Sequence, residues 1–296
     1  MEKPILFFTV LITILSSCKS EDANVIPKET YSNSGAQTLV HDGVTREYIL
    51  YVPDSYNEDN PVPLVLNFHG FGDRAVDFMS YADMRALAES DRFILVYPQG
   101  SLLNGASHWN ACPSGGDNKS NTDDFGFIES MIAKISSQYA IDMERIYAAG
   151  YSNDGMMAYG LANYKSDLIA AVASVSGAML DCTGPTSHPM AVIHLHGTAD
   201  SVIPYNGGGG WSATQSTLNH WIDFNNTNTT PTVNNDSNSG MTIEHYFYDQ
   251  GDGLVSVEHY KYIGGDHVWF NASFQGQSTS ELIWGFIARY DINGLR

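Results

Sequence analysis

The sequence predicts a single α/β domain with a mostly parallel central sheet that is flanked by helices. Short, continuous apolar runs alternate along the chain with longer amphipathic stretches. Continuous apolar strands are typical of a parallel sheet that helices cover on both faces. The composition, 43% hydrophobic and 12% aromatic, is sufficient for one large core. Because no internal repeat or second linker is visible, we expect a single domain over residues 37–296.

The N-terminus carries the features of an export signal over residues 1–18. Lys3 precedes an apolar run over residues 5–15, which is about half the length that a membrane-spanning helix needs. The run ends in Leu-Ser-Ser-Cys, which resembles a bacterial lipobox and implies that Cys18 becomes the lipidated first residue. An ordinary signal peptide with a chance cysteine is the alternative.

Residues 19–36 are polar and lack periodicity, so we interpret them as a flexible tether. Their first four residues resemble an acidic sorting signal for the outer surface. We therefore expect an exported protein that meets the membrane only through its lipid anchor. The outer membrane is its expected location, with exposure at the cell surface as a further expectation.

The first half of the domain begins with an early strand over residues 47–52, which ends at a proline. Residues 64–68 form a short apolar run before a His-Gly pair, as a buried strand does. A helix is expected over residues 78–90, and the next strand, 93–97, is again stopped by a proline. These elements alternate as a parallel sheet requires.

An amphipathic helix over residues 125–139 follows Asp123 and Asp124, and either aspartate suits its N-cap position. The later elements show the same alternation and end in a hairpin with a glycine-containing turn. They are a strand (145–149), a helix (153–163), strands (169–175 and 190–195), a helix (214–224), a surface loop (227–240), the hairpin (241–248 and 254–262) and a closing helix (280–290).

The formal net charge is −19, and no cluster of basic residues occurs. Nucleic acid is therefore excluded as a partner, because phosphate binding requires such clusters. Strongly anionic polymers are disfavoured for the same electrostatic reason. A neutral or sparsely charged substrate fits this charge.

Cys112 and Cys182 remain once Cys18 is assigned to the lipid anchor. Two cysteines in an exported domain favour a disulfide. Closing a loop of about 70 residues would stabilise the fold by roughly 4 kcal/mol. Two unpaired thiols are the alternative.

Ser152 is the candidate nucleophile because it lies between a predicted strand and a predicted helix, in Gly-Tyr-Ser-Asn-Asp-Gly. A strand-to-helix elbow exposes a serine at the carboxyl edge of a sheet and directs the N-terminus of the helix toward it. An incidental serine at such a junction is the alternative. A serine hydroxyl needs a base, a group that orients the base, and donors for the developing oxyanion.

Asp200 and His267 are the candidates for the orienting acid and the general base. Each follows a predicted strand, so each is expected on a loop at the carboxyl edge of the sheet. The chain order Ser, Asp, His is that of the α/β-hydrolase arrangement. The backbone N–H groups of Phe71 and Asn153 are the candidate oxyanion donors, since glycines flank Phe71 and Asn153 opens the helix after the serine.

Several segments together resemble the secreted polyhydroxybutyrate depolymerase-like, feruloyl and acetylxylan esterases, a broad family of carbohydrate esterases. The resemblance spans most of residues 45–270 in order and implies an α/β-hydrolase fold with Ser152, Asp200 and His267 as the triad. It also implies that Trp109 and Trp269 lie near the acyl or sugar pocket; ordinary core aromatics are the alternative. The matching segments are His69-Gly70, Val96-Tyr97-Pro98, residues 109–112, 123–127, 150–157, 196–205 and 264–269.

One residue departs from the family pattern: Asp154 occupies the position of a glycine. A carboxylate there is expected to crowd the elbow and to oppose the oxyanion, and Asp154→Gly is expected to raise kcat. The His194-x-His196 pair could bind a metal, but His196 belongs to the family's His-Gly turn, so neither a metal nor a cofactor is expected.

The sequence therefore predicts a serine carboxylesterase that acts on feruloyl or acetyl esters of a polysaccharide or oligosaccharide, as a monomer. A short-chain polyester depolymerase is the alternative on the same fold. A catalytically impaired surface glycan-binding protein is the alternative of another class, which Asp154 makes conceivable.

Overall fold

The computed structural model describes residues 35–113 and 120–296. The predicted signal peptide, Cys18 and the tether up to residue 34 lie outside the described residues. Residues 35 and 36, expected in the tether, instead begin the first strand, since they pair with Leu50 and Ile49. None of the helices in the described ranges combines the length and apolar character needed to cross a membrane.

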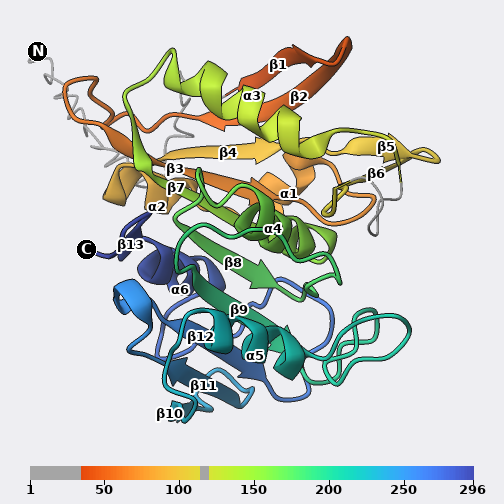
Figure 1. Ribbon diagram of the computed structural model, residues 1–296, viewed down its shortest axis with the longest axis vertical. Helices are drawn as coiled ribbons and strands as arrows, with labels where there is room; N and C mark the ends of the chain where they lie inside the picture. The colour runs from red at the N-terminus through yellow and green to blue at the C-terminus, as the bar shows by residue number, and fades with distance from the viewer. Residues whose placement is uncertain (1–34, 114–119) are drawn as a thin grey trace, which may run out of the picture. The chain divides into compact units, whose positions relative to one another are not determined.

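A ten-stranded sheet forms the centre of the domain, in the order β1-β2-β4-β3-β7-β8-β9-β12-β11-β10 (Figure 1). The block from β4 to β12 is parallel, and two antiparallel strands flank it on each side. Its strands are β1 (Gly35–His41), β2 (Val44–Tyr51), β3 (Val62–Phe68), β4 (Ile94–Pro98), β7 (Ile141–Tyr151), β8 (Ala171–Val175), β9 (Ala191–Gly197), β10 (Thr232–Asp236), β11 (Ile243–Tyr248) and β12 (Val257–Tyr262).

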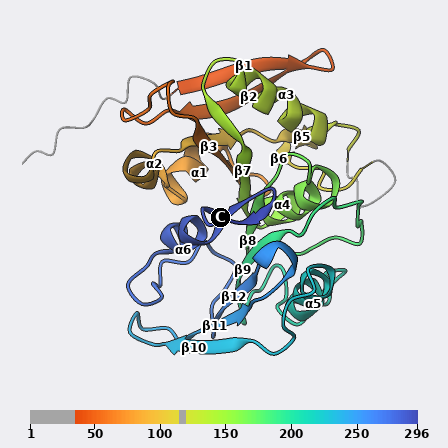
Figure 2. The same cartoon turned by 60° about the vertical axis from the view of Figure 1, so that its left-hand side comes forward.

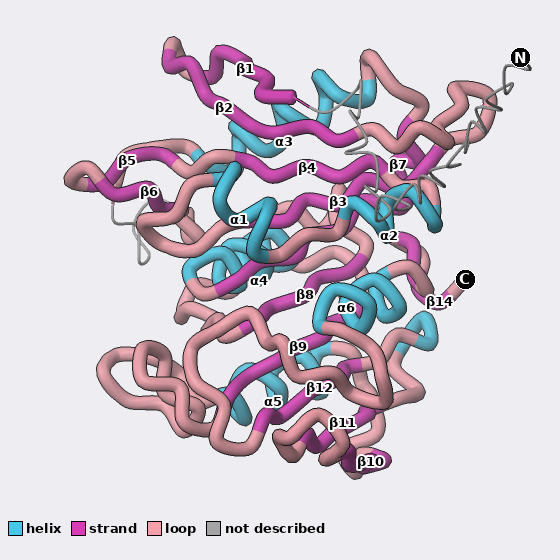
Figure 3. Tube along the Cα trace, turned by 180° about the vertical axis from the view of Figure 1, so that it is seen from behind, coloured by secondary structure: helices cyan, strands magenta, loops and turns pink. Residues whose placement is uncertain are grey.

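Helices cover both faces of the sheet, as Figure 2 shows with the sheet seen nearly edge-on. One face carries α3, α4 and α5, and the opposite face, seen in Figure 3, carries α1, α2 and α6. The helices are α1 (Ala75–Tyr81), α2 (Arg85–Asp91), α3 (Asp124–Ser136), α4 (Asn153–Tyr164), α5 (Thr214–Phe224), the short 3₁₀ helix η1 (Asp252–Leu254) and α6 (Thr279–Ile287). Two small ribbons complete the fold, β5 (Ser101–Leu103) with β6 (Ala106–His108) and β13 (Tyr290–Asp291) with β14 (Gly294–Leu295).

The alternation of side chains along β3 explains why the sheet is buried on both faces. Leu64, Leu66 and Phe68 belong to the core on the α3, α4 and α5 side, and Val65 belongs to the core on the other side. All seven residues of β3 are buried. The predicted fold class is confirmed: the chain has the mostly parallel, helix-flanked sheet of an α/β-hydrolase.

Two predicted elements are wrong. The helix expected over residues 78–90 is two helices, because the Tyr97 hydroxyl donates to the carbonyl of Ala82 and accepts from the N–H of Met84 at the break. The loop expected over residues 227–240 contains β10, which pairs antiparallel with β11. Four of the five β10 residues are exposed, so this edge strand lacks the apolar alternation that predicts a strand.

Candidate active site

Ser152 occupies the tight turn between β7 and α4, with φ 61° and ψ −121°. This backbone conformation is unusual for a residue with a side chain and is typical of strained functional positions. Two glycines make the turn possible. A Cβ on Gly150 would lie 2.4 Å from the carbonyl oxygen of Asp154, and a Cβ on Gly155 would lie 2.4 Å from Ser174 Oγ. The glycines at positions 150 and 155 therefore permit the close contacts that this turn requires.

His267 bridges the other two predicted triad residues. Its Nε2 lies 2.8 Å from Ser152 Oγ, and its Nδ1 lies 2.8 Å from Asp200 Oδ2. A carboxylate only accepts hydrogen bonds, so Nδ1 carries the proton and Nε2 accepts from the serine hydroxyl. The three residues follow β7, β9 and β12, whose parallel carboxyl ends meet at one edge of the sheet. The geometry is that of a nucleophile, a base and an orienting acid.

Asp200 is held as a charged acceptor. Its other oxygen, Oδ1, accepts the backbone N–H groups of Val202 at 2.9 Å and Ile203 at 2.7 Å. Burial raises the pKa of Asp200, but hydrogen bonds from His196, His267 and these two backbone groups outweigh it and hold the pKa well below its ordinary value. The carboxylate is therefore ionised at any pH at which the histidine acts as a base.

Asp266 joins the loop of the acid to the loop of the histidine, a role that the sequence did not reveal. Its Oδ1 accepts the backbone N–H of His267 at 2.8 Å and both the N–H and the hydroxyl of Ser201 at 2.9 Å. In the sequence, an aspartate beside a histidine in a glycine-rich loop cannot be distinguished from a solvent-exposed residue. Only the approach of Ser201, 65 positions earlier, gives it a function.

The predicted oxyanion donors follow two parallel strands, β3 and β7, at the same edge of the sheet. Asn153 is the first residue of α4, where backbone N–H groups have no partner inside the helix. Phe71 follows β3. Within residues 35–113 and 120–296, no hydrogen bond uses the backbone N–H of either residue. Both groups are therefore available to an oxygen that is bound beside Ser152.

The side chain of Asn153 orders the segment that contains Trp109. Its Oδ1 accepts the N–H of Trp109 at 2.8 Å, and its Nδ2 donates to the Trp109 carbonyl at 3.3 Å. The disulfide between Cys112 and Cys182, with a Cα–Cα distance of 5.8 Å, fixes the same segment three residues later. The predicted disulfide is confirmed, and it stabilises a loop that packs against the elbow.

The two tryptophans predicted near the substrate have buried rings. Trp109 is 2% exposed and packs edge-on against Phe68, while Trp269 is 4% exposed and packs edge-on against Phe78. Little ring area is therefore open to a substrate, and their role in binding stays a prediction. The exposed apolar side chains closest in sequence to the triad and the oxyanion loop are Phe71, Val202 and Val268.

Asp154 is fully buried, and neither of its carboxyl oxygens has a hydrogen-bond partner among the described residues. Burial raises the pKa of this carboxyl group to about 7. The Asp154 carboxylate in turn raises the pKa of the His69 imidazole, against the lowering effect of burial. Burial therefore favours the neutral form of Asp154, and the expected repulsion of an oxyanion applies only to its ionised form.

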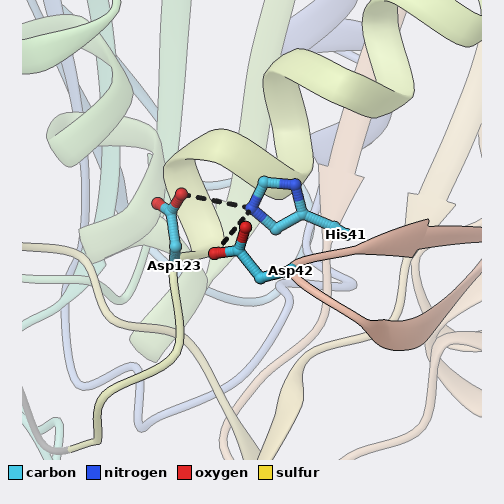
Figure 4. A group of neighbouring side chains, drawn as sticks. All are labelled: His41, Asp42 and Asp123. Atoms are coloured by element: carbon cyan, nitrogen blue, oxygen red, sulfur yellow. Dashed lines mark hydrogen bonds and ion pairs between the residues drawn. The ribbon is translucent and has the colours of Figure 1, made fainter.

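Two groups of metal-binding residue types have other partners in the described residues. His41, Asp42 and Asp123 lie together at the β1–β2 turn and the start of α3 (Figure 4). There, His41 Nε2 lies 3.1 Å from Asp123 Oδ2, and the other oxygen of Asp123 caps the helix at Gly126. His194 and His196 are hydrogen bonded to each other at 3.1 Å. These contacts explain both groups without a metal.

Residues 46–206 match the family described as Esterase PHB depolymerase, a range that contains Ser152 and Asp200. A bifunctional acetylxylan esterase/xylanase from Neocallimastix patriciarum is 27% identical over 252 residues, 85% of this chain and 34% of that protein. A probable feruloyl esterase C from Aspergillus niger is 29% identical over 172 residues, 57% of this chain and 60% of that protein. The chain thus spans one third to three fifths of these two relatives.

The fold is shared with solved structures of low sequence identity. An acetyl xylan esterase from Aspergillus awamori superposes with a TM-score of 0.60 at 16% identity, covering 86% of this chain and 99% of that one. An S-formylglutathione hydrolase from Agrobacterium tumefaciens reaches 0.58 at 13% identity, covering 88% and 96%. The match over residues 46–206 and these folds confirm the resemblance noted in the sequence, and the chain belongs to the Esterase PHB depolymerase family.

Proposed function

We propose that this protein is an exported serine carboxylesterase that removes feruloyl or acetyl groups from polysaccharide. The observation that carries the proposal is the imidazole of His267, at 2.8 Å from both Ser152 Oγ and Asp200 Oδ2. Both distances are those of hydrogen bonds, so the imidazole can accept the serine proton while the carboxylate orients the imidazole.

In the proposed acylation, Ser152 Oγ attacks the ester carbonyl carbon while His267 Nε2 takes the hydroxyl proton. The carbonyl oxygen becomes an oxyanion that accepts hydrogen bonds from the backbone N–H groups of Phe71 and Asn153. Collapse of this intermediate breaks the bond to the alcohol oxygen of the sugar. That oxygen receives the proton from His267, and the acyl group remains on Ser152.

Deacylation repeats these steps with water. His267 takes a proton from the water as its oxygen attacks the acyl carbon, the same donors stabilise the second oxyanion, and the Ser152 oxygen leaves with the proton. Asp200 stays ionised throughout and stabilises the imidazolium that forms twice per cycle. The hydrogen bonds that keep the pKa of Asp200 low support this role.

The relatives and the surface of the protein support the proposed substrate class. The two relatives described above are named for acetylxylan and feruloyl esters. Exposed Phe71, Val202 and Val268 offer apolar contacts for an acyl group, and the net charge of −19 favours a neutral polymer. We further propose that a lipid on Cys18 anchors a monomeric enzyme at the outer membrane.

A polyester depolymerase is the second candidate, and the family description favours it. The same triad would cleave ester bonds within the polymer backbone, with a hydroxyacyl group on Ser152. The third candidate, an impaired glycan-binding protein, depends on Asp154. It is weakened because burial keeps that carboxyl group largely neutral below pH 7.

The test compares p-nitrophenyl acetate, methyl ferulate, acetylated xylan and short-chain polyhydroxybutyrate with the chain that starts at Lys19. We expect turnover of the small esters and release of acetate or ferulate. Ser152→Ala should abolish turnover of all substrates, while Ser256→Ala, which removes a buried hydroxyl remote from the triad, should leave it unchanged.

Release of hydroxybutyrate alone would support the polyester depolymerase. Absence of all hydrolysis with retained binding to xylan would support the glycan-binding protein. Residual turnover in Ser152→Ala at more than about one thousandth of the normal rate would contradict the proposed nucleophile.

A further inference from the structure

Two buried histidines of β9, His194 and His196, lie behind the acid of the triad and take part in no proton transfer of the proposed mechanism. They are two residues apart on one strand, so their side chains share a face of the sheet, and they are 0% and 1% exposed. We propose that Tyr159, His194 and His196 form a directional hydrogen-bond chain that positions Asp200. The expected effect on turnover rests on the proposed function, whereas the donor-to-acceptor direction of the hydrogen bonds does not.

The direction is set at Asp200. His196 Nε2 lies 3.1 Å from Asp200 Oδ2 and 2.9 Å from the carbonyl oxygen of Ile203. Both partners only accept hydrogen bonds, so Nε2 carries the proton. In a neutral imidazole the other nitrogen is then an acceptor. His196 Nδ1 lies 3.1 Å from His194 Nε2, which therefore donates to it.

The next step leads to α4. With its proton on Nε2, His194 has a bare Nδ1, which lies 2.8 Å from the hydroxyl of Tyr159. The hydroxyl therefore donates to His194. Burial and the neighbouring His196 keep the pKa of His194 well below its ordinary value, so this ring stays neutral. Three hydrogen bonds thus point the same way, from Tyr159 to the carboxylate of Asp200.

The position of Tyr159 shows what the hydrogen-bond chain connects. Tyr159 lies on α4, the helix that begins directly after Ser152. The chain therefore connects the helix of the nucleophile to the loop of the acid through β9, independently of His267. At its end, Asp200 Oδ2 accepts from both His196 and His267. A second donor on that oxygen restricts the rotation of the carboxylate and keeps it in line with the base.

The activity test uses Tyr159→Phe, with Tyr147→Phe as a matched control. Both hydroxyls are buried and donate one short hydrogen bond, but that of Tyr147 goes to the carbonyl of Tyr290, away from the triad. With p-nitrophenyl acetate we expect kcat to fall about tenfold in Tyr159→Phe with KM unchanged, and to stay constant in Tyr147→Phe. Equal effects of the two variants on kcat would overturn the proposal.

His196 allows a rescue experiment. His196→Leu removes the donor to Asp200 and should lower kcat about a hundredfold. His196→Gln should recover most of this loss, because its amide nitrogen occupies the position of Nε2 and carries hydrogen. If both variants lose activity equally while remaining folded, His196 serves packing alone and the proposal fails.

Nitrogen-15 NMR of the histidine side chains tests the direction without any substrate. We expect His194 and His196 both as neutral tautomers with the proton on Nε2, in the unmodified chain at pH 7. A proton on Nδ1 of either ring, or two protons on His196, would overturn the assigned direction. A protein that hydrolyses no ester but shows these tautomers would refute the proposed function and leave the chain of hydrogen bonds intact.

Discussion

Asp154 lies two residues after Ser152, and its surroundings affect the chemistry proposed for that serine. Its carboxyl group is buried without a hydrogen-bond partner in the described part of the chain, and its pKa is raised to about 7. Folding therefore favours its protonated form, whereas the unfolded chain ionises it near pH 4. Between these values the folded state holds a proton that the unfolded state has released, so stability decreases as pH rises from about 4 to 7.

Asp154→Asn removes this titration while keeping the size of the side chain. At pH 8 the variant should be more stable by at most about 4 kcal/mol, measured by urea unfolding, and below pH 4 the two proteins should be equal. Its kcat should exceed that of the unmodified enzyme above pH 7 and equal it at pH 5.5, because only the ionised carboxyl group opposes an oxyanion. A gain that is independent of pH would contradict this explanation.

Single residues also show what the sequence can and cannot predict about the site. Ser152, Asp200 and His267 were predicted because each follows a strand in the expected chain order, and hydrogen bonds join them. Asp266 and the partners of His194 could not be predicted in this way. Their roles depend on contacts between side chains of different strands and loops, for which the sequence has no local pattern.

At the scale of elements, helix ends and edge strands were the least predictable features. The break between α1 and α2 depends on the hydroxyl of Tyr97, a residue of the neighbouring strand. The β10 strand is defined by its pairing with β11 and not by its own side chains. The central strands were predictable because burial on both faces requires continuous apolar runs.

The start of α6 provides a test of helix capping. Ser278 Oγ accepts the N–H of Glu281, and the carboxylate of Glu281 accepts the N–H of Ser278 at 2.7 Å. Ser278→Ala should lower the free energy of unfolding by about 1 kcal/mol, measured by urea denaturation. Ser216→Ala, an exposed serine within α5, is the control and should not destabilise the fold. Equal changes in both variants would show that the capping box contributes nothing.

At the scale of the whole molecule, the disulfide stabilises the fold by linking two distant segments. Cys112 and Cys182 join the segment before α3 to the segment before β9, at a sequence separation of 70. Their link restricts the unfolded chain because it closes a long loop, which in the folded state contains α3, β7, α4 and β8.

Replacing both cysteines by alanine should reduce the free energy of unfolding by roughly 4 kcal/mol, as measured in denaturant. At 25 °C, kcat should fall by a smaller factor than the equilibrium constant for unfolding rises, because the Asn153 side chain still binds the Trp109 backbone. A variant with unchanged stability would indicate that packing alone fixes this segment.

The position of the histidine in the sequence determines when the proposed triad can be complete during synthesis. His267 follows β12, the last strand of the parallel block to be made, and that strand pairs with β9. A chain that is still emerging from the ribosome already carries its serine and its carboxylate, yet lacks the group that removes the hydroxyl proton. The triad proposed for this protein is therefore complete only once the loop that follows β12 has been synthesised and β12 has paired with β9.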